Sequence, residues 1–338
     1  MSNNLNRQLN IEILRILSML LITVWHIRVH YMADLHDDGS LARTFMDYLM
    51  YFIPFHVNLF ILIMGYFGIR NCRKKLINTL LLLYFYSISI NVILWISGEG
   101  FNVSDAFLPV SGNTWWFMTV YTVMLMVAPI IERYVSEASV KSVNMLVLGG
   151  LFVNFYLGFI RQVNNIYDYG YGLVNFTSVY LIGVWIRIVG TRLLTPPRYS
   201  RTLVFMAICL TMAAQYYLIP YKTWSRMTAY CGPYALAMSV LVFIFFSTLK
   251  IPEYFRKPVL FLSSSAIAVY MITDHAAIRS MLVKPFSEFF LPYNNGISGV
   301  LVIILVTLSA YTVSCVIDKI RIGVTAYLNK KVCHLLNI

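Results

Sequence analysis

The sequence predicts an all-α protein, a polytopic membrane bundle of about ten transmembrane helices with both termini in the cytoplasm. Hydrophobic residues make up 59% of the 338 residues, charged residues make up 12%, and the mean hydropathy is +0.71. This composition excludes a soluble globular domain and a disordered chain. Apolar runs of about 20 residues, long enough to cross a bilayer as a helix, recur along the chain. The chain is therefore an integral membrane protein by its composition and patterning.

The apolar runs follow one another with short loops between them, so we expect residues 1–338 to form a single membrane domain. None of the loops is long enough to fold separately. An enzyme of this kind must build its site among the helices, in a cavity that water and substrates can enter. The predicted helices lie near residues 11–31, 48–68, 76–97, 114–132, 143–160, 173–190, 203–220, 231–249, 259–282 and 297–318.

The distribution of basic residues predicts the orientation. Most of the 26 Lys and Arg residues fall in the loops on the side that carries both chain ends, which predicts cytoplasmic termini by the positive-inside rule. The net charge of +12 lies in short loops beside the membrane, so we expect contact with anionic membrane lipid and none with nucleic acid. The first apolar run lacks a small-x-small cleavage site and is predicted to be a retained helix.

The first predicted helix carries two ionisable residues in its interior, Arg15 and His26. Burying an ionisable side chain in hydrocarbon is costly, so such residues are rare and are candidates for a functional site. Eleven residues of α-helix turn through about 1100°, which places Arg15 and His26 within roughly 20° of one face and about 16 Å apart. One face of this helix therefore carries a fixed cation and a titratable base.

A structural role is the alternative for these residues. Glu12 lies three residues before Arg15 and can form a neutralised pair with it, while His26 can be a hydrogen-bonded core residue. A metal site is less favoured. His26 and His30 have the i, i+4 spacing of helix-borne ligands, but no HExxH pattern or third ligand accompanies them. The five cysteines form no CxxC pair, so we expect no metal and no tightly bound cofactor.

The second predicted helix ends in a Gly-Tyr-Phe-Gly segment that leads into a basic cluster. Arg70 and Arg73 are three residues apart and can direct two planar guanidinium groups at one phosphorylated ligand. A cluster that only fixes the membrane topology is the alternative. Arg15 is predicted to lie on the same side of the membrane.

Other polar and aromatic residues are expected in the outer half of the membrane, where they are candidates for an acceptor site. Asp274, His275 and Arg279 belong to the ninth predicted helix, in which His275 and Arg279 share a face. Trp at an interface is first of all a membrane anchor, which is the alternative for Trp116. The remaining candidates are His56 and Asn58 of the second predicted helix.

The first two helices resemble the membrane-bound acyltransferase-3 family, whose members include bacterial O-antigen and capsule O-acetyltransferases. Arg15 and His26 match the Arg-x10-His spacing of the family's first helix, and Glu12 stands where an acidic residue is usual. The family's FxxxSG(F/Y) segment and the Arg-x-x-Arg that follows it are similar to Phe60, Gly65-Tyr66, Arg70 and Arg73, with Met64 in place of the usual serine.

Two later segments are also similar to this family. Trp116, Phe117, Tyr121 and Pro129 match its WF-L…Y…P helix. The segment SSSAIAVYMITDHAAIR resembles its late S…YL-H segment, although His275 falls two residues later than in the commonest form. We therefore carry no catalytic role over to His275. The resemblance covers essentially the whole chain.

The resemblance implies a multi-pass O-acyltransferase of the bacterial plasma (inner) membrane. It would transfer acetyl, or another acyl group, from cytoplasmic acyl-CoA to a sugar hydroxyl of a surface or secreted glycan. Glu12, Arg15 and His26 are then catalytic, with His26 as the base, because imidazole titrates near pH 6.5. Arg70 and Arg73 would bind the CoA phosphates, and Tyr121 joins the acceptor-site candidates. A thioester is already activated, so no metal is required.

The main alternative is a transporter or flippase for a polyprenyl-linked sugar or a small anion, in which Arg15 and His26 gate or neutralise the cargo. Transporters often have two related halves with broken helices in corresponding places, and the sequence has no such repeat. A glycan polymerase is a third reading, weakened by the short outer loops.

Overall fold

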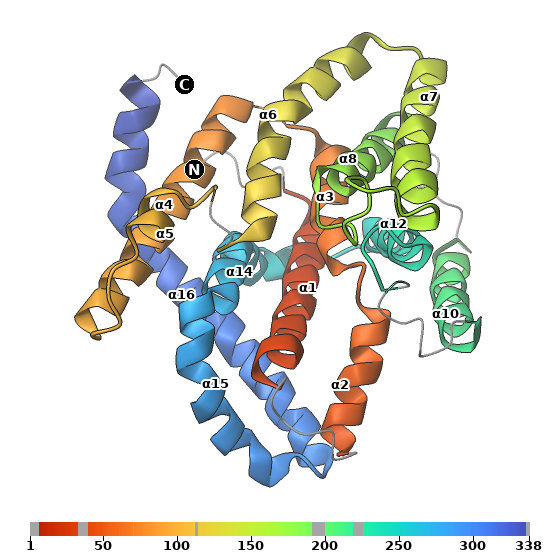
Figure 1. Ribbon diagram of the computed structural model, residues 1–338. Helices are drawn as coiled ribbons and strands as arrows, with labels where there is room; N and C mark the ends of the chain where they lie inside the picture. The colour runs from red at the N-terminus through yellow and green to blue at the C-terminus, as the bar shows by residue number, and fades with distance from the viewer. Residues whose placement is uncertain are drawn as a thin grey trace. The chain divides into compact units, whose positions relative to one another are not determined.

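The computed structural model describes residues 7–32, 40–69, 71–111, 114–190, 200–218, 226 and 228–335. Within these residues every regular element is a helix and no strand occurs, which confirms the all-α prediction (Figure 1). The α-helices are α1 (Leu9–His26), α2 (Leu41–Phe52), α3 (His56–Phe67), α4 (Cys72–Ile96), α5 (Val103–Phe107), α6 (Trp116–Glu137), α7 (Val140–Leu151), α8 (Leu173–Ile188), α10 (Ser200–Leu218), α12 (Pro233–Ser247), α13 (Arg256–Ser263), α14 (Ala266–Asp274), α15 (Ala276–Phe290) and α16 (Ile297–Leu335).

Shorter elements of other helical types continue or join these helices. They are the π-helical turns η2 (Ile27–Tyr31) and η3 (Phe152–Ile160) and the 3₁₀ turns η5 (Glu253–Phe255) and η6 (Leu291–Tyr293). The π-helical turns extend α1 and α7, so that Leu9–Tyr31 and Val140–Ile160 are each continuous candidate spans.

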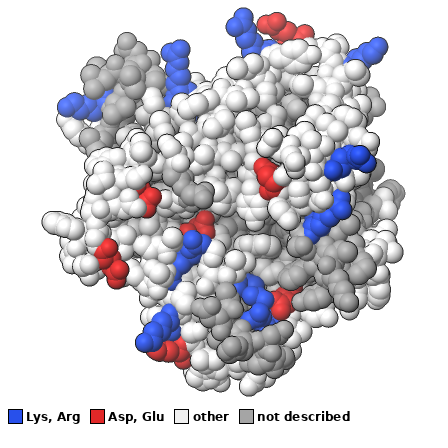
Figure 2. Space-filling view, viewed as in Figure 1, with Lys and Arg blue, Asp and Glu red and all other residues white. Residues whose placement is uncertain are grey.

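In the described part of the chain, eight helical segments are long and apolar enough to cross a membrane. Two further apolar helices, α8 and α12, are shorter, and together the ten segments correspond to the ten runs predicted from the sequence. The visible face in Figure 2 is mostly uncharged. Helix α10 leaves Leu203, Leu210 and Leu218 exposed, as expected of a helix that faces lipid. The chain is a polytopic helical membrane protein.

The structure corrects two of the predicted helices. The second begins earlier, at Leu41, and is interrupted before His56 at Pro54, which has no N–H to continue the helical hydrogen bonds. The run predicted near 259–282 is broken twice, after Ser263 and at His275. At the second break the imidazole Nδ1 of His275 accepts a hydrogen bond from the backbone N–H of Ala277, and this local cap starts α15 in a new direction.

The chain divides into two compact units. Unit 1 comprises Met1–Ser18, Leu49–Arg70 and Val127–Ser263, and unit 2 comprises Met19–Tyr48, Asn71–Met126 and Ser264–Ile338. Each unit gathers segments that are far apart in the sequence.

Glycines allow α3 and α8 to approach closely in unit 1. A Cβ atom at Gly183 would overlap the carbonyl oxygen of Leu62, and a Cβ atom at Gly65 would overlap that of Tyr180. Small residues at helix contacts permit such backbone approach in membrane proteins. The crossing of α3 and α8 therefore depends on the absence of side chains at these two positions.

We expect Gly183→Ala to destabilise the protein, because the added methyl group must push the backbones of α3 and α8 apart. Overpacking of this kind costs about 1–3 kcal/mol, which should appear as a lower midpoint of thermal unfolding of the purified protein. Gly149→Ala is the matched control, since Gly149 lies in α7 of the same unit and its Cβ would meet open space. Equal midpoints for the two variants would contradict the close crossing.

Candidate active site

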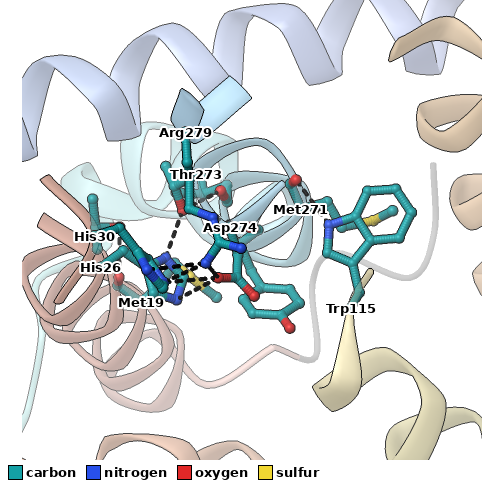
Figure 3. A network of polar contacts seen from close by, with 11 residues as sticks. Met19, His26, His30, Trp115, Met271, Thr273, Asp274 and Arg279 are labelled. Carbon is teal, nitrogen blue, oxygen red and sulfur yellow. Dashed lines mark hydrogen bonds and ion pairs between the residues drawn. The ribbon is translucent and has the colours of Figure 1, made fainter. Parts of the chain in front are cut away.

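The carboxylate of Asp274, the last residue of α14, is the centre of a polar cluster in unit 2 (Figure 3). Its Oδ1 atom lies 3.3 Å from Nη1 of Arg279, 3.3 Å from Nε2 of His30 and 3.7 Å from Nε2 of His26. Three helical elements meet here, namely the end of α1 with η2, the end of α14, and the first turn of α15. One carboxylate oxygen therefore faces one arginine and two histidines.

The cluster is buried, and its charges balance. His26 is 6% exposed and Asp274 is 7% exposed, whereas the side chains of His30 and Arg279 are about one quarter exposed. A buried carboxylate is tolerated when a cation pairs with it, and Arg279 provides that cation. With both imidazoles neutral the cluster has no net charge, so an added proton would change its charge to +1.

The local backbone places these side chains together. The chain leaves α1 through the wider π-helical turn η2, in which the N–H of Met32 bonds to the carbonyl of Ile27 at 3.1 Å. Single π-helical turns are often found at functional sites. The break at His275 ends α14 directly after Asp274, and Arg279 follows in the first turn of α15. A continuous helix through this region would not have this geometry.

The hydrogen bonds of Thr273 assign the tautomer of His26. The Thr273 hydroxyl lies 2.9 Å from the carbonyl of Val269 and 3.0 Å from Nδ1 of His26. A hydroxyl has one hydrogen, so when it donates to the Val269 carbonyl it can only accept from His26. Nδ1 of His26 then carries the hydrogen, and Nε2 keeps its lone pair. The 3.7 Å gap from Nε2 to Asp274 is too long for a hydrogen bond, which agrees with this assignment.

Arg279 holds His30 and Asp274 in place. Its Nη1 atom lies 2.6 Å from Nε2 and 3.0 Å from Nδ1 of His30, and 3.3 Å from Oδ1 of Asp274. A guanidinium can only donate, so the nitrogen of His30 that faces it must accept. The shorter contact is to Nε2, so in the neutral ring this nitrogen accepts from Arg279 and has no hydrogen to give to Asp274. Arg279 is therefore the donor that pairs with the carboxylate, and it holds His30 beside it.

Aromatic side chains enclose the other side of α14. The indole of Trp115 is fully buried and donates from Nε1 to the carbonyl of Met271 at 3.0 Å. The ring of Tyr270 lies 5.8 Å from that of His26 and 5.6 Å from that of Phe117, on which Tyr121 stacks. Of the predicted acceptor residues, Tyr121 thus belongs to this aromatic group. Trp116 begins α6 and contacts Phe117 edge-on at 6.0 Å.

The ring of His275 contacts Trp115 and caps α15 and does not belong to the carboxylate cluster. Its ring meets the edge of Trp115 at 5.3 Å, and its Nδ1 caps α15. Residue 275 lies just beyond the candidate span that ends at Asp274, and burial lowers its pKa, so the ring is neutral at pH 7. The helix break thus gives His275 and Arg279 different neighbours, although a continuous helix would place them on one face.

Glu12 and Arg15 belong to unit 1 and form the ion pair that their spacing predicted. Oε1 of Glu12 accepts from Nη1 of Arg15 at 2.6 Å and from Nε of Arg7 at 2.9 Å. Glu12 is buried, whereas the side chain of Arg15 is 27% exposed and its guanidinium carbon lies 6.0 Å from the ring centre of Phe67. Both ion-pair residues share α1 with His26.

His56 and Asn58 also belong to unit 1, where both are buried. Asn58 donates to the carbonyl of Tyr230 at 2.8 Å and accepts from Asn175, which in turn accepts from Asn154. The ring of His56 packs 5.7 Å from that of Tyr230. These side chains link helices of unit 1, as buried amides do in membrane bundles.

The structure describes one of the two arginines that were predicted to bind CoA. Arg73 is exposed in the first turn of α4, within unit 2. Arg70 lies outside the described residues. In the described part of the chain, no group of three or more His, Cys, Asp or Glu side chains is arranged to hold a metal.

Sequence reasoning missed His30 and Thr273 as members of this cluster. His30 carried a signal, its i, i+4 spacing from His26, but that spacing was weighed only as a metal pair. Thr273 stands two residues before His275, the position at which the commonest form of the family segment has its histidine. Its hydrogen bond to His26 joins residues 247 positions apart, a pairing that has no local sequence signal.

Fold and site together define a multi-pass membrane protein with a buried histidine–carboxylate site. A family model described as an acyltransferase domain matches residues 8–319. The chain therefore belongs to the acyltransferase-3 family and is a membrane acyltransferase. Neither the curated proteins nor the solved structures include a match to this chain.

We predict that Asp274→Asn lowers the rate of acyl transfer by at least about tenfold, because an amide of the same shape cannot stabilise a protonated His26. His26→Ala should lower the rate by about 10²–10⁴, the usual contribution of a general base. Both rates are measured as transfer of a labelled acyl group by the purified protein in lipid nanodiscs, with the protein's thermal midpoint recorded beside them.

Asp47→Asn is the control for the carboxylate, since Asp47 pairs with Arg28 in the same unit but takes no part in the cluster. It should retain near-normal turnover. If Asp274→Asn were as active as Asp47→Asn, the carboxylate would have no role in the reaction.

Proposed function

We propose that the protein is an O-acetyltransferase that moves acetyl from cytoplasmic acetyl-CoA to a sugar hydroxyl of a bacterial surface or secreted glycan. The observation that carries the proposal is the buried His26, whose Nδ1 lies 3.0 Å from the Thr273 hydroxyl and whose Nε2 lies 3.7 Å from Asp274, in a chain of the acyltransferase-3 family. A base of this kind suits proton removal from an alcohol.

In the proposed reaction His26 acts on the acceptor hydroxyl. Its Nε2 takes the hydroxyl proton while the acceptor oxygen attacks the carbonyl carbon of the thioester. The carbon–sulfur bond breaks, an ester forms on the sugar, and the departing thiolate of CoA receives the proton from His26. The imidazolium exists only during this sequence, and the Asp274 carboxylate at 3.7 Å attracts it more strongly than it attracts the neutral ring.

The proposed donor site uses the basic residues Arg15, Arg70 and Arg73. Guanidinium groups suit phosphate because their planar forks form paired hydrogen bonds, and Arg15 and Arg73 are both at least partly exposed. The acceptor candidates are His56, Asn58, Trp116, Tyr121, Asp274, His275 and Arg279. With both termini in the cytoplasm, the donor side would be the cytoplasmic face of the bacterial inner membrane and the product would form on the opposite face.

A sided assay tests the proposal. The purified protein is reconstituted in proteoliposomes that enclose polysaccharide and lipid-linked precursors extracted from a strain in which the gene is deleted. Radiolabelled acetyl-CoA is supplied outside. In vesicles whose Arg73 loop faces outward, we expect alkali-labile label on the enclosed glycan and free CoA outside, with neither product in His26→Ala. Movement of glycan without consumption of the thioester would instead identify a transporter.

A further inference from the structure

A pocket in unit 2 is lined by the end of α4, by α5 and by the start of α15. Its volume is about 830 Å³, within the range of small-ligand sites. Helix α5 is a short segment that lies against α4, and α15 begins at the helix break. The side chains that line it include those of Asn91, Phe101, Asn102, Asp105, Thr114 and His275.

His275 lines this pocket and carries a hydrogen-bond donor without a partner among the described residues. His275 is 4% exposed, and the Nδ1 atom of its ring accepts a hydrogen bond from the backbone N–H of Ala277 at 3.2 Å. The hydrogen of the neutral ring must then be on Nε2. That atom is buried and has no hydrogen-bond partner among the described residues. A buried donor without a partner is unfavourable, and a ligand oxygen that reaches Nε2 would satisfy it.

Asp105 brings a fixed acceptor with spare capacity. Its carboxylate accepts from Nδ2 of Asn102 at 2.8 Å and from the hydroxyl of Thr114 at 3.4 Å. An ionised carboxylate can accept about four hydrogen bonds, so about two positions remain for ligand hydroxyls. The backbone N–H of Asn102 bonds to the buried Asn91 side chain at 3.1 Å, which holds this loop on α4.

Phe101 adds an apolar surface, and the charge of the pocket is negative. An aromatic ring beside converging donors and acceptors suits a molecule with one apolar face and several hydroxyl groups, as a sugar ring has. The described lining residues include the carboxylates of Asp105 and Glu99 but no Lys or Arg. An anionic ligand would therefore meet uncompensated negative charge.

We propose that this pocket binds one neutral or amino-sugar ring of the acceptor and rejects acidic sugars such as uronic acids. The assignment rests on the proposed function, because it identifies the acceptor of that reaction. Asp274 and His275 are consecutive residues, so the helix break that ends α14 presents one side chain to His26 and the next to the pocket.

The test is direct sugar binding to the full-length protein in nanodiscs that contain no glycoside detergent, because such a detergent would compete. Saturation-transfer NMR is recorded with three probes that share one skeleton, N-acetylglucosamine, glucosamine and glucuronic acid. We expect N-acetylglucosamine and glucosamine to bind, and glucuronic acid to bind at least about tenfold more weakly, the effect of losing one charge-assisted hydrogen bond and gaining a repulsion.

Three substitutions locate the binding. Phe101→Ala removes the apolar face, Asp105→Asn removes the charge, and His275→Asn keeps an acceptor near Nδ1 for the cap of α15 but deletes the Nε2–H. Each should weaken binding of N-acetylglucosamine about fivefold or more. Glu288→Gln is the control, since Glu288 is an exposed carboxylate on α15 that does not line the pocket. Thermal midpoints identify any variant that fails to fold, and Phe101→Ala disturbs no hydrogen bond of the loop.

The outcomes separate this proposal from the proposed function. Absence of sugar binding by the wild type, equal affinity for glucuronic acid, or binding that survives Phe101→Ala together with Asp105→Asn would overturn the pocket assignment. Sugar binding to the wild type without acetyl-CoA consumption in the sided assay would leave the pocket in place and remove the acyltransferase reaction.

Discussion

The site depends on one buried carboxylate. Asp274 is a buried negative charge, and its burial is tolerable because the guanidinium of Arg279 pairs with it. It stands between the C-terminus of α14, whose helix dipole disfavours a carboxylate, and the N-terminus of α15, whose dipole favours one. The break at His275 is therefore part of the same arrangement, since it creates that N-terminus and brings Arg279 back to Asp274.

The same arrangement leaves His26 available for chemistry. Arg279 pairs with Asp274, and Thr273 accepts the Nδ1 hydrogen of His26, so no described residue engages the Nε2 lone pair. A proton on Nε2 makes the ring a cation 3.7 Å from the carboxylate of Asp274, so the electrostatic benefit appears only when the ring becomes charged. Stabilisation that grows along the reaction raises the rate, whereas an interaction already complete in the resting state does not.

Composition and periodicity were sufficient to predict the fold class and the ten helical segments, because hydrocarbon forces every backbone polar group into a helix. The same reasoning selected His26, Asp274 and Arg279, which are ionisable residues in apolar runs. It could not predict that they meet, since contacts such as His26 with Thr273 join distant segments. It also treated 259–282 as one helix. The hydrogen bond by which His275 caps α15 leaves no periodic pattern in the sequence, so the break there could not be predicted. His56 and Asn58 had the same polar-in-apolar signal as His26, yet their observed contacts link helices of unit 1.

The proposed chemistry requires that resting His26 is protonated on Nδ1 and free on Nε2. Nitrogen-15 NMR of the full-length protein in nanodiscs, labelled at histidine and assigned with His26→Gln, measures the protonation of each ring nitrogen at neutral pH. The account predicts a protonated Nδ1 and an unprotonated Nε2 for His26, with a change in the Nδ1 signal on Thr273→Val. A hydrogen on Nε2 directed at Asp274 would contradict it, because His26 could not then accept a proton from a substrate at that atom.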